Sequence, residues 1–301
     1  MQLSSDAGAG SPVAGEQLTV ASVLALAKAS LLTSGVPEAA LEASVLLAGC
    51  LKQSRSWVIT HAEMPLAASD IGCFLAMVER RRRREPSAYI LGEKQWLDIT
   101  LRVDRNVLIP RPETELLAEE AIAALRELTR TLEHAPRAVD VGTGSGALAI
   151  AMARSTPEAQ IIAVDNSAGA LRVARSNAER LNSGAIEFVL GSLLDADISP
   201  RDLVVANLPY VPTSEIGKLE PELAYEPTGA LDGGLDGLDL IRALLLQAKR
   251  SLAPGGRLLL ECGAGQSPNI AHQARDFWPD AQIRVRLDYA GIDRIVVAEI
   301  A

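Results

Sequence analysis

From residue 137 to the end of the chain, short apolar runs alternate with helical stretches, and this alternation constrains the fold more than any other feature. The runs are RAVDV, QIIAVD, AIEFVL, DLVVAN and GRLLLE, then residues 283–287 and 294–298. Alternating strand and helix units with apolar strands are typical of a parallel sheet covered on both faces. The last two runs are joined by a turn without a helix. The sequence therefore predicts an α/β, Rossmann-like fold with a mainly parallel seven-stranded sheet and an antiparallel C-terminal hairpin.

The part of the chain before this sheet has a different pattern. Apolar residues recur at helical spacing from residue 18 to about residue 84, which predicts a small all-α domain. A chain of 301 residues is long enough for two cores. We expect a flexible tail at 1–17, a helical domain at 18–85, a hairpin and linker at 86–110, and the α/β domain at 111–301.

Five consecutive arginines, residues 80–84, end the last predicted helix of the first domain, and Pro86 stops that helix. Such a run is most often a solvated helix end with a favourable placement in the helix dipole. The alternative is a contact for an acidic or nucleic-acid partner.

Composition excludes several classes of protein. The net charge of −9 argues against non-specific wrapping of DNA, which needs clustered basic residues, so we expect no direct nucleic-acid binding. The apolar runs fall far short of the roughly 20 residues of a membrane span. The first seventeen residues do not resemble a targeting peptide, and we expect a cytoplasmic protein. Cys50, Cys73 and Cys262 are odd in number and widely spaced, so neither a disulfide framework nor a paired-cysteine metal site is predicted.

A glycine-rich loop, DVGTGSGAL, follows the first strand of the α/β domain and leads into a helix. Gly142, Gly144 and Gly146 permit a tight turn and close approach of the backbone to a ligand. Similar loops serve dinucleotide enzymes. Asp140 before the glycines opposes a pyrophosphate but favours a ligand with an ammonium and a sulfonium, and Asp165 at the end of the second strand is placed to hold ribose hydroxyls. These residues favour S-adenosylmethionine.

The fourth strand ends in Asn207-Leu-Pro-Tyr. The first and fourth strands flank the point where strand order reverses in open α/β sheets, and ligands bind there. We therefore expect Asn207 to Tyr210 to face the ligand of the glycine loop. An Asn side-chain oxygen and a backbone carbonyl can accept both hydrogens of a planar NH₂ group, and Tyr210 offers a ring face. This predicts a methyltransferase that acts on an amide or on a nucleobase amine.

Taken together, several motifs resemble those of the HemK-type protein glutamine methyltransferases of peptide chain release factors. The likeness spans nearly the whole chain from about residue 18. It is carried by REPSAYILG at 84–92, VLIPRPETE at 107–115, DVGTGSGA at 140–147, NLPY at 207–210, Glu226-Pro with ALDGG at 230–234, and PGG at 254–256.

The resemblance implies a class I S-adenosylmethionine-dependent methyltransferase that modifies the Gln of the Gly-Gly-Gln motif in class 1 release factors. It also implies that the helical domain helps to dock the release factor. By position, the substrate would meet Asn207, Leu208, Pro209 and Tyr210. The implied cofactor residues are Asp140, Gly142, Thr143, Gly144, Ser145, Gly146, Asp165, Leu193 and Asn207. Two positions depart from the family pattern: Leu208 stands where Pro is usual, and Ser192 replaces an Asp near the adenine.

Three other interpretations are open at this point. A nucleic-acid adenine methyltransferase carries a similar turn that holds a flipped base. A non-catalytic module could keep the fold and bind a translation factor. A nicotinamide dehydrogenase is the least favoured, because no residue set for hydride transfer accompanies the glycine loop.

Overall fold

The computed structural model describes residues 17–195 and 200–301, and the chain divides into two compact units, Met1–Leu91 and Gly92–Ala301. The expected tail at residues 1–17 lies outside the described residues except for Gln17. The division falls after Leu91, whereas we had expected a helical domain that ends at residue 85 and a separate linker. The physical reason is that Ile90 packs in the core of the helical unit.

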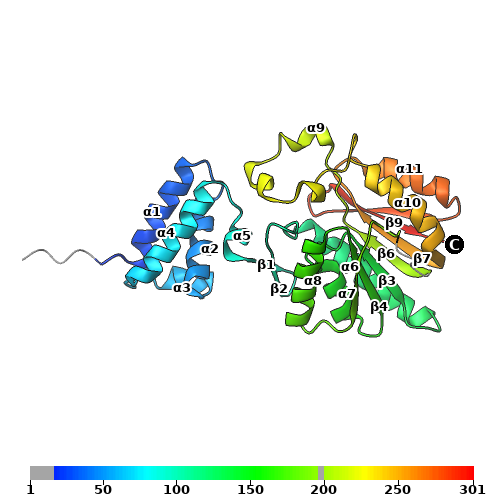
Figure 1. The fold of residues 1–301 in the computed structure, drawn as a ribbon, viewed down its shortest axis with the longest axis horizontal. Helices are drawn as coiled ribbons and strands as arrows, with labels where there is room; N and C mark the ends of the chain where they lie inside the picture. The colour runs from blue at the N-terminus through cyan, green and yellow to red at the C-terminus, as the bar shows by residue number, and fades with distance from the viewer. Residues whose placement is uncertain (1–16, 196–199) are drawn as a thin grey trace, which may run out of the picture. The chain divides into compact units, whose positions relative to one another are not determined.

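The first unit consists of helices around one apolar core (Figure 1). Thr19 caps the first helix, since its side chain accepts a hydrogen bond from the Ser22 amide. Val23, Leu46 and Phe74 are among the side chains that fill the core. The helices are α1 (Val20–Thr33), α2 (Ala39–Leu51), α3 (Arg55–Thr60), α4 (Ala68–Arg82) and α5 (Ser87–Leu91). The predicted all-α region is confirmed.

The arginine run lies at the end of α4 and is bound within its own unit. Arg81 is only 4% exposed, so the run is more than the solvated helix end that the sequence favoured. The ion pairs join Arg80 to Glu85, Arg81 to Glu42, and both Arg82 and Arg83 to Glu79. These pairs tie α4 to α2 and to the turn that follows α4, which gives the run a structural part.

The second unit contains a seven-stranded sheet in the order β5-β4-β3-β6-β7-β9-β8. The first five of its strands in sequence run parallel, and β9 pairs antiparallel with β7 and with β8. The strands are β3 (Arg137–Val141), β4 (Gln160–Asp165), β5 (Ile186–Leu190), β6 (Arg201–Ala206), β7 (Leu252–Glu261), β8 (Gln282–Leu287) and β9 (Asp293–Glu299). The predicted fold class is confirmed. A two-stranded hairpin, β1 (Glu93–Trp96) with β2 (Ile99–Arg102), precedes this sheet.

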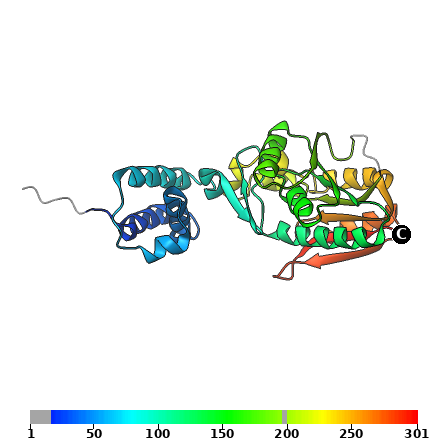
Figure 2. The same cartoon turned by 90° about the horizontal axis from the view of Figure 1, so that it is seen from below.

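Helices cover both faces of the sheet (Figures 1 and 2). One face packs against α6 (Glu113–Thr131) and α7 (Ala147–Ser155), with α8 (Ala168–Arg180) beside β4 and β5. The other face packs against α10 (Asp239–Ser251) and α11 (Ser267–Phe277). Strands β3 and β6 are buried on both sides, which explains why they read as continuous apolar runs. No described helix combines the length and apolar character needed to cross a membrane.

Strand order reverses between β3 and β6, which are adjacent with Val141 opposite Ala206. The connections from these two strands diverge to opposite faces, so a crevice opens beyond their carboxyl ends. The glycine loop follows β3 and Asn207 follows β6. The segment after Asn207 contains short elements that we did not predict, α9 (Thr213–Ile216), η1 (Pro221–Tyr225) and η2 (Thr228–Ala230).

Candidate active site

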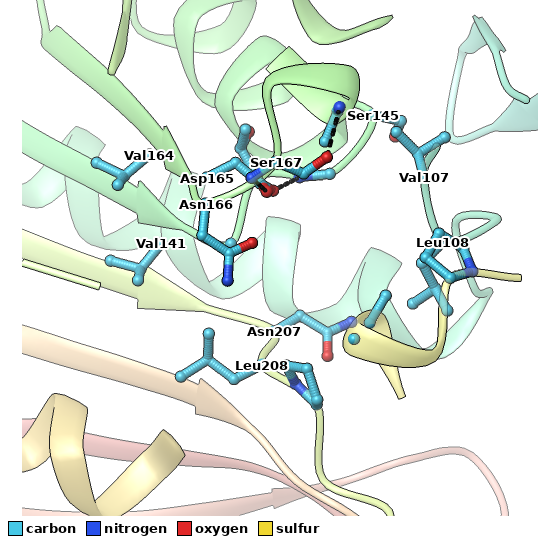
Figure 3. Close-up of a pocket in the computed structure, with 18 of the residues that line it drawn as sticks. Val107, Leu108, Val141, Ser145, Val164, Asp165, Asn166, Ser167, Asn207 and Leu208 are labelled. Atoms are coloured by element: carbon cyan, nitrogen blue, oxygen red, sulfur yellow. Dashed lines mark hydrogen bonds between the residues drawn. The ribbon is translucent and has the colours of Figure 1, made fainter. Parts of the chain in front are cut away.

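A cavity lies beyond the carboxyl ends of β3, β4 and β6 (Figure 3). The empty space between its wall residues, open solvent included, is about 1150 Å³. The predicted site residues in its wall are Gly142, Thr143, Gly144, Ser145, Asp165, Leu193, Asn207, Leu208 and Pro209. The structure thus brings both predicted motifs to one cavity. Asp140, Gly146 and Tyr210 are not part of the wall.

The glycine loop has the backbone conformation that its composition demands. Gly142, Gly144 and Gly146 all have positive φ angles, of 75°, 54° and 85°. The amides of Gly142 and Thr143 both donate to the carbonyl of Val164 at 2.9 Å, which fastens the loop to the end of β4. Residues with side chains rarely adopt these angles, so glycine at these positions lets the chain turn from β3 into α7 beside the cavity.

Asp140 stabilises this loop through two side-chain hydrogen bonds. Its Oδ2 accepts hydrogen bonds from the Thr143 hydroxyl at 2.6 Å and from the Ala149 amide at 3.1 Å. The residue is 1% exposed, and burial raises the pKa of its carboxyl to about 7. The expected contact of Asp140 with the cofactor stays a prediction. In the structure the buried side chain joins the loop to the start of α7.

Asp165 ends β4 and faces the cavity (Figure 3). Its carboxylate accepts from the Gly144 amide at 2.9 Å and from the Ser167 amide at 2.8 Å. Burial raises the pKa of this carboxyl, while the backbone hydrogen bonds oppose that rise. Val164 and Leu193 add apolar side chains to the same part of the wall. A carboxylate next to apolar side chains suits a ribose diol joined to a planar base.

Asn207 lies on the opposite side of the open space from Asp165 in Figure 3. Its Nδ2 donates to Oγ1 of Thr114, at the start of α6, over 2.9 Å. Leu208 is 5% exposed and belongs to the apolar core on the face of the sheet that packs against α10 and α11. A Cβ on Gly142 would lie 3.1 Å from Cδ2 of Leu208, so the two predicted motifs pack closely against each other.

Tyr210 lies just behind the cavity wall. Burial raises the pKa of its phenol to about 12, with a smaller contribution from the charge of Glu261. Its backbone carbonyl accepts from Nε2 of Gln266 at 3.0 Å. Gly233 packs directly against this turn, because an added Cβ would lie 2.6 Å from the Pro209 carbonyl oxygen and 2.8 Å from Cα of Tyr210. The position of the turn is therefore fixed by backbone contacts.

Glu226 joins two segments of the wall, and sequence reasoning assigned it no role. The residue is 6% exposed, and its carboxylate accepts from the Ile109 amide at 3.0 Å and from the Arg111 guanidinium at 2.6 Å. Pro110 and Arg111 from the first segment and Pro227 from the second line the cavity. The motifs around residues 107–115 and 226–227 were visible in the sequence, but only the fold shows that they bond to each other.

Glu261, the last residue of β7, is a second group that sequence reasoning missed. It is 2% exposed, and burial raises the pKa of its carboxyl to about 7. The polar side chains of Thr114 and Asn207 nearby lower this pKa and so oppose that rise. The only signal in the sequence was an acid at the end of an otherwise apolar strand.

Comparisons with known proteins agree with the fold. Residues 22–92 match the family model described as the PrmC N-terminal domain, and residues 132–294 match a methyltransferase domain. The catalytic domain of hMettl16, in complex with the MAT2A 3′UTR hairpin 6, has the same fold with a TM-score of 0.53 and 13% identity. The match covers 78% of this chain and 82% of that one. The match over residues 132–294, more than half of the chain, shows that the chain is a methyltransferase.

Its sequence relatives define the family more narrowly. The release factor glutamine methyltransferase of Geobacter sulfurreducens is 37% identical over 92% of this chain and 95% of its own length. That of Deinococcus radiodurans is 37% identical over 92% and 96%, and that of Gloeobacter violaceus is 45% identical over 74% and 78%. The chain belongs to the release factor glutamine methyltransferase family.

Proposed function

We propose that this protein transfers a methyl group from S-adenosylmethionine to the side-chain amide nitrogen of the Gln in the Gly-Gly-Gln motif of class 1 release factors. The observation that carries the proposal is the meeting of Asn207 with the glycine loop and Asp165 in one cavity. A planar NH₂ group bound at Asn207 would lie beside a ligand bound at the loop. Membership of the family supports the choice of substrate.

The residues of the loop side fit the proposed cofactor. Asp165 offers a carboxylate for the ribose hydroxyls, and Val164 and Leu193 offer apolar contacts for the adenine. The amides at the start of α7 suit the carboxylate of the methionine part. S-adenosylmethionine, when bound, supplies an electrophilic methyl group on a sulfonium that is already a good leaving group. Ser192 lines the adenine corner where the family pattern has an Asp, so this corner holds its ligand without that charge.

The chain's own contribution to the reaction is positioning. Oδ1 of Asn207 and the backbone carbonyl of Leu208 accept the two hydrogens of the substrate amide and hold its nitrogen in plane. Leu208 presents the same backbone oxygen as a proline, and Pro209 behind it favours extended geometry at residue 208. Alignment of this kind supplies several kcal/mol of a transfer barrier. Tyr210 and the apolar wall keep water from the reacting atoms.

The helical unit is the proposed docking domain for the release factor. It matches the PrmC N-terminal domain, and its core is separate from that of the methyltransferase unit. Since four arginines of the run are paired to acids of the same unit, we place the docking contact on other surfaces of the helices. The proposed substrate acts in translation, so we propose a cytoplasmic site of action.

The named relatives do not favour the alternative of a nucleic-acid adenine methyltransferase. A non-catalytic binding module is opposed by the complete cavity, with Asn207 and Asp165 both in its wall.

The direct test is incubation of the protein with labelled S-adenosylmethionine and, separately, class 1 release factors, tRNA and DNA. Mass mapping then locates the methyl group. We expect label on the Gln of the Gly-Gly-Gln motif. Label on nucleic acid alone, or cofactor binding without transfer to any release factor, would contradict the proposal.

A further inference from the structure

Glu261 occupies a position that its packing alone does not explain. It follows Leu260, which pairs with Ala206, so the ends of β7 and β6 place Glu261 next to Asn207. The residue is 2% exposed, and its Oε2 atom has no hydrogen-bond partner among the described residues. A buried carboxyl that is only partly satisfied costs free energy. Such a group next to Asn207, which lines the cavity, is expected where it serves the chemistry.

Its neighbours are the side chains that hold Asn207. Nδ2 of Asn207 donates to Oγ1 of Thr114 at 2.9 Å. Both polar side chains lie near the Glu261 carboxyl, and both lower its pKa. An ionised carboxylate accepts hydrogen bonds and cannot donate them. The amide nitrogen of Asn207, and not its oxygen, must therefore face Glu261. This arrangement leaves Oδ1 of Asn207 as the acceptor for a ligand.

We propose that Glu261 is a positioning residue that fixes the carboxamide orientation of Asn207, so that Oδ1 is presented to the substrate amide. The inference rests on the proposed function, because it deepens the account of the same site. Glu261 itself lies beside Asn207 and Thr114 and is not a residue of the cavity wall. In the opposite orientation, the amide nitrogen of Asn207 would meet the NH₂ group of the substrate, and two donors would oppose each other.

Protonation of Glu261 removes the preference for one orientation of the Asn207 carboxamide. The carboxyl has a pKa of about 7, set first by burial, raised further by Glu113 of α6 and lowered by Arg294 of β9. The phenol of Tyr210, after β6, also lies within the field of Glu261 and is neutral in this pH range. A protonated Glu261 can donate to Oδ1 of Asn207, and either amide orientation is then satisfied. The transfer rate should fall as the pH drops through about 7.

The kinetic test compares Glu261→Leu, Glu261→Gln and Asp202→Asn in single turnovers with a release factor at saturating cofactor. Glu261→Leu should slow transfer by about tenfold to a hundredfold, as the loss of one preorganised group does elsewhere. Glu261→Gln can also donate to Oδ1 of Asn207, so it should resemble the protonated form and show the low-pH rate of wild type at every pH. Asp202→Asn is the matched control, since Asp202 is a buried carboxylate at the other end of the sheet, bound to Arg137. It should lower thermal stability and leave the rate unchanged.

The pH profile separates positioning from a purely structural role. Wild type should lose rate below about pH 7, whereas Glu261→Gln should be nearly flat over this range. Asp140 has a similar pKa and could add its own pH dependence. Asp140 is present in both wild type and Glu261→Gln, so its titration does not contribute to the difference between them. Saturating cofactor also limits any effect that acts through the glycine loop.

A second readout needs no activity. In protein labelled with ¹⁵N-asparagine, the side-chain NH₂ signal of Asn207, assigned by its loss in Asn207→Ala, should titrate near pH 7 in wild type and not in Glu261→Gln. Equal rates for Glu261→Leu and wild type, or identical pH titrations for wild type and Glu261→Gln, would overturn the inference. If wild type methylates no release factor, the proposed function fails, and the NH₂ titration still decides the role of Glu261.

Discussion

The two sides of the cavity are built in different ways. On the proposed cofactor side, the carboxylates bond to groups nearby in sequence: Asp140 to residues three and nine positions away, and Asp165 to Gly144 across 21 positions. On the proposed substrate side, Asn207 bonds to Thr114 across 93 positions. Glu226 reaches the amide of Ile109 across 117 positions.

This difference separates a local motif from an assembled site. The loop after β3 forms its bonds within one strand–helix–strand unit, so its geometry is set when that unit folds. Asn207 depends on α6 and β7, and the segments that surround it are joined only when the whole sheet is complete. Substitutions on the loop side should therefore act on cofactor affinity, and those on the Asn207 side on the transfer step.

Asn207→Ala tests the difference between the two sides of the cavity, and we expect it to have the largest effect. The substitution removes an acceptor from the substrate amide where alignment matters most. We expect single-turnover transfer to fall by about a hundredfold or more. Cofactor affinity, measured by calorimetric titration, should change by less than about threefold, well under 1 kcal/mol. A loss of affinity as large as the loss of rate would show that the two sides are not separable.

Asp165→Ala should give the converse result. A carboxylate that bonds ribose hydroxyls contributes about 1.5–3 kcal/mol, so cofactor affinity should weaken by about tenfold to a hundredfold. Single-turnover transfer at saturating cofactor should stay close to that of wild type. Asp165→Asn is the matched variant, because it keeps the shape and one acceptor for the loop amides. An unchanged dissociation constant in both variants would break the assignment.

Asp140→Asn tests how the buried Asp140 carboxyl stabilises the glycine loop. The quantity measured is the pH dependence of the free energy of unfolding. The pKa of Asp140 is raised to about 7 in the folded protein, so the folded state binds this proton more tightly than the unfolded chain does. Its stabilising contribution is present at low pH and is lost as the pH rises through about 7. Between pH 5 and 7, the free energy of unfolding of wild type should fall by on the order of 2 kcal/mol relative to Asp140→Asn. Denaturant titrations at several pH values measure this difference, and parallel curves would contradict it.

The smallest effect is expected for Leu208→Pro. If the site uses the backbone carbonyl of residue 208, the substitution keeps the same oxygen, and turnover should change by less than about tenfold. The side chain also packs near Gly142, so a modest loss of thermal stability is expected. Should Leu208→Pro damage transfer as much as Asn207→Ala, the Leu side chain is itself part of the site.

The sequence predicted the parts of this structure that depend on local pattern. The strands, their helices and the hairpin β8–β9 follow from period and turn signals, and the reversal of order at β3 and β6 follows from general topology. Asn207 and Asp165 were found because polar residues end apolar strands. Glu261 ends such a strand as well, but its role depends on Thr114 and Asn207, two residues that only folding brings to it.

Asp140 shows that the sequence did not predict the direction of a side chain, even where it predicted the position of the loop. Its place before the glycines favoured a ligand contact, yet the turn rotates its side chain into the interior. A pattern of residue types shows where a loop lies along the chain. It does not show which way each side chain of that loop points, because that depends on the helix packed beside it.

The close packing of Gly233 against the Pro209–Tyr210 turn has a consequence for mutational scans and for engineering. Even one methyl group at this position would collide with backbone atoms that cannot move aside without shifting the turn. Gly233 should therefore tolerate as few replacements as Asn207, although it has no side chain to offer a substrate. A Gly233→Ala variant would shift the turn itself while every side chain that faces the cavity stays the same.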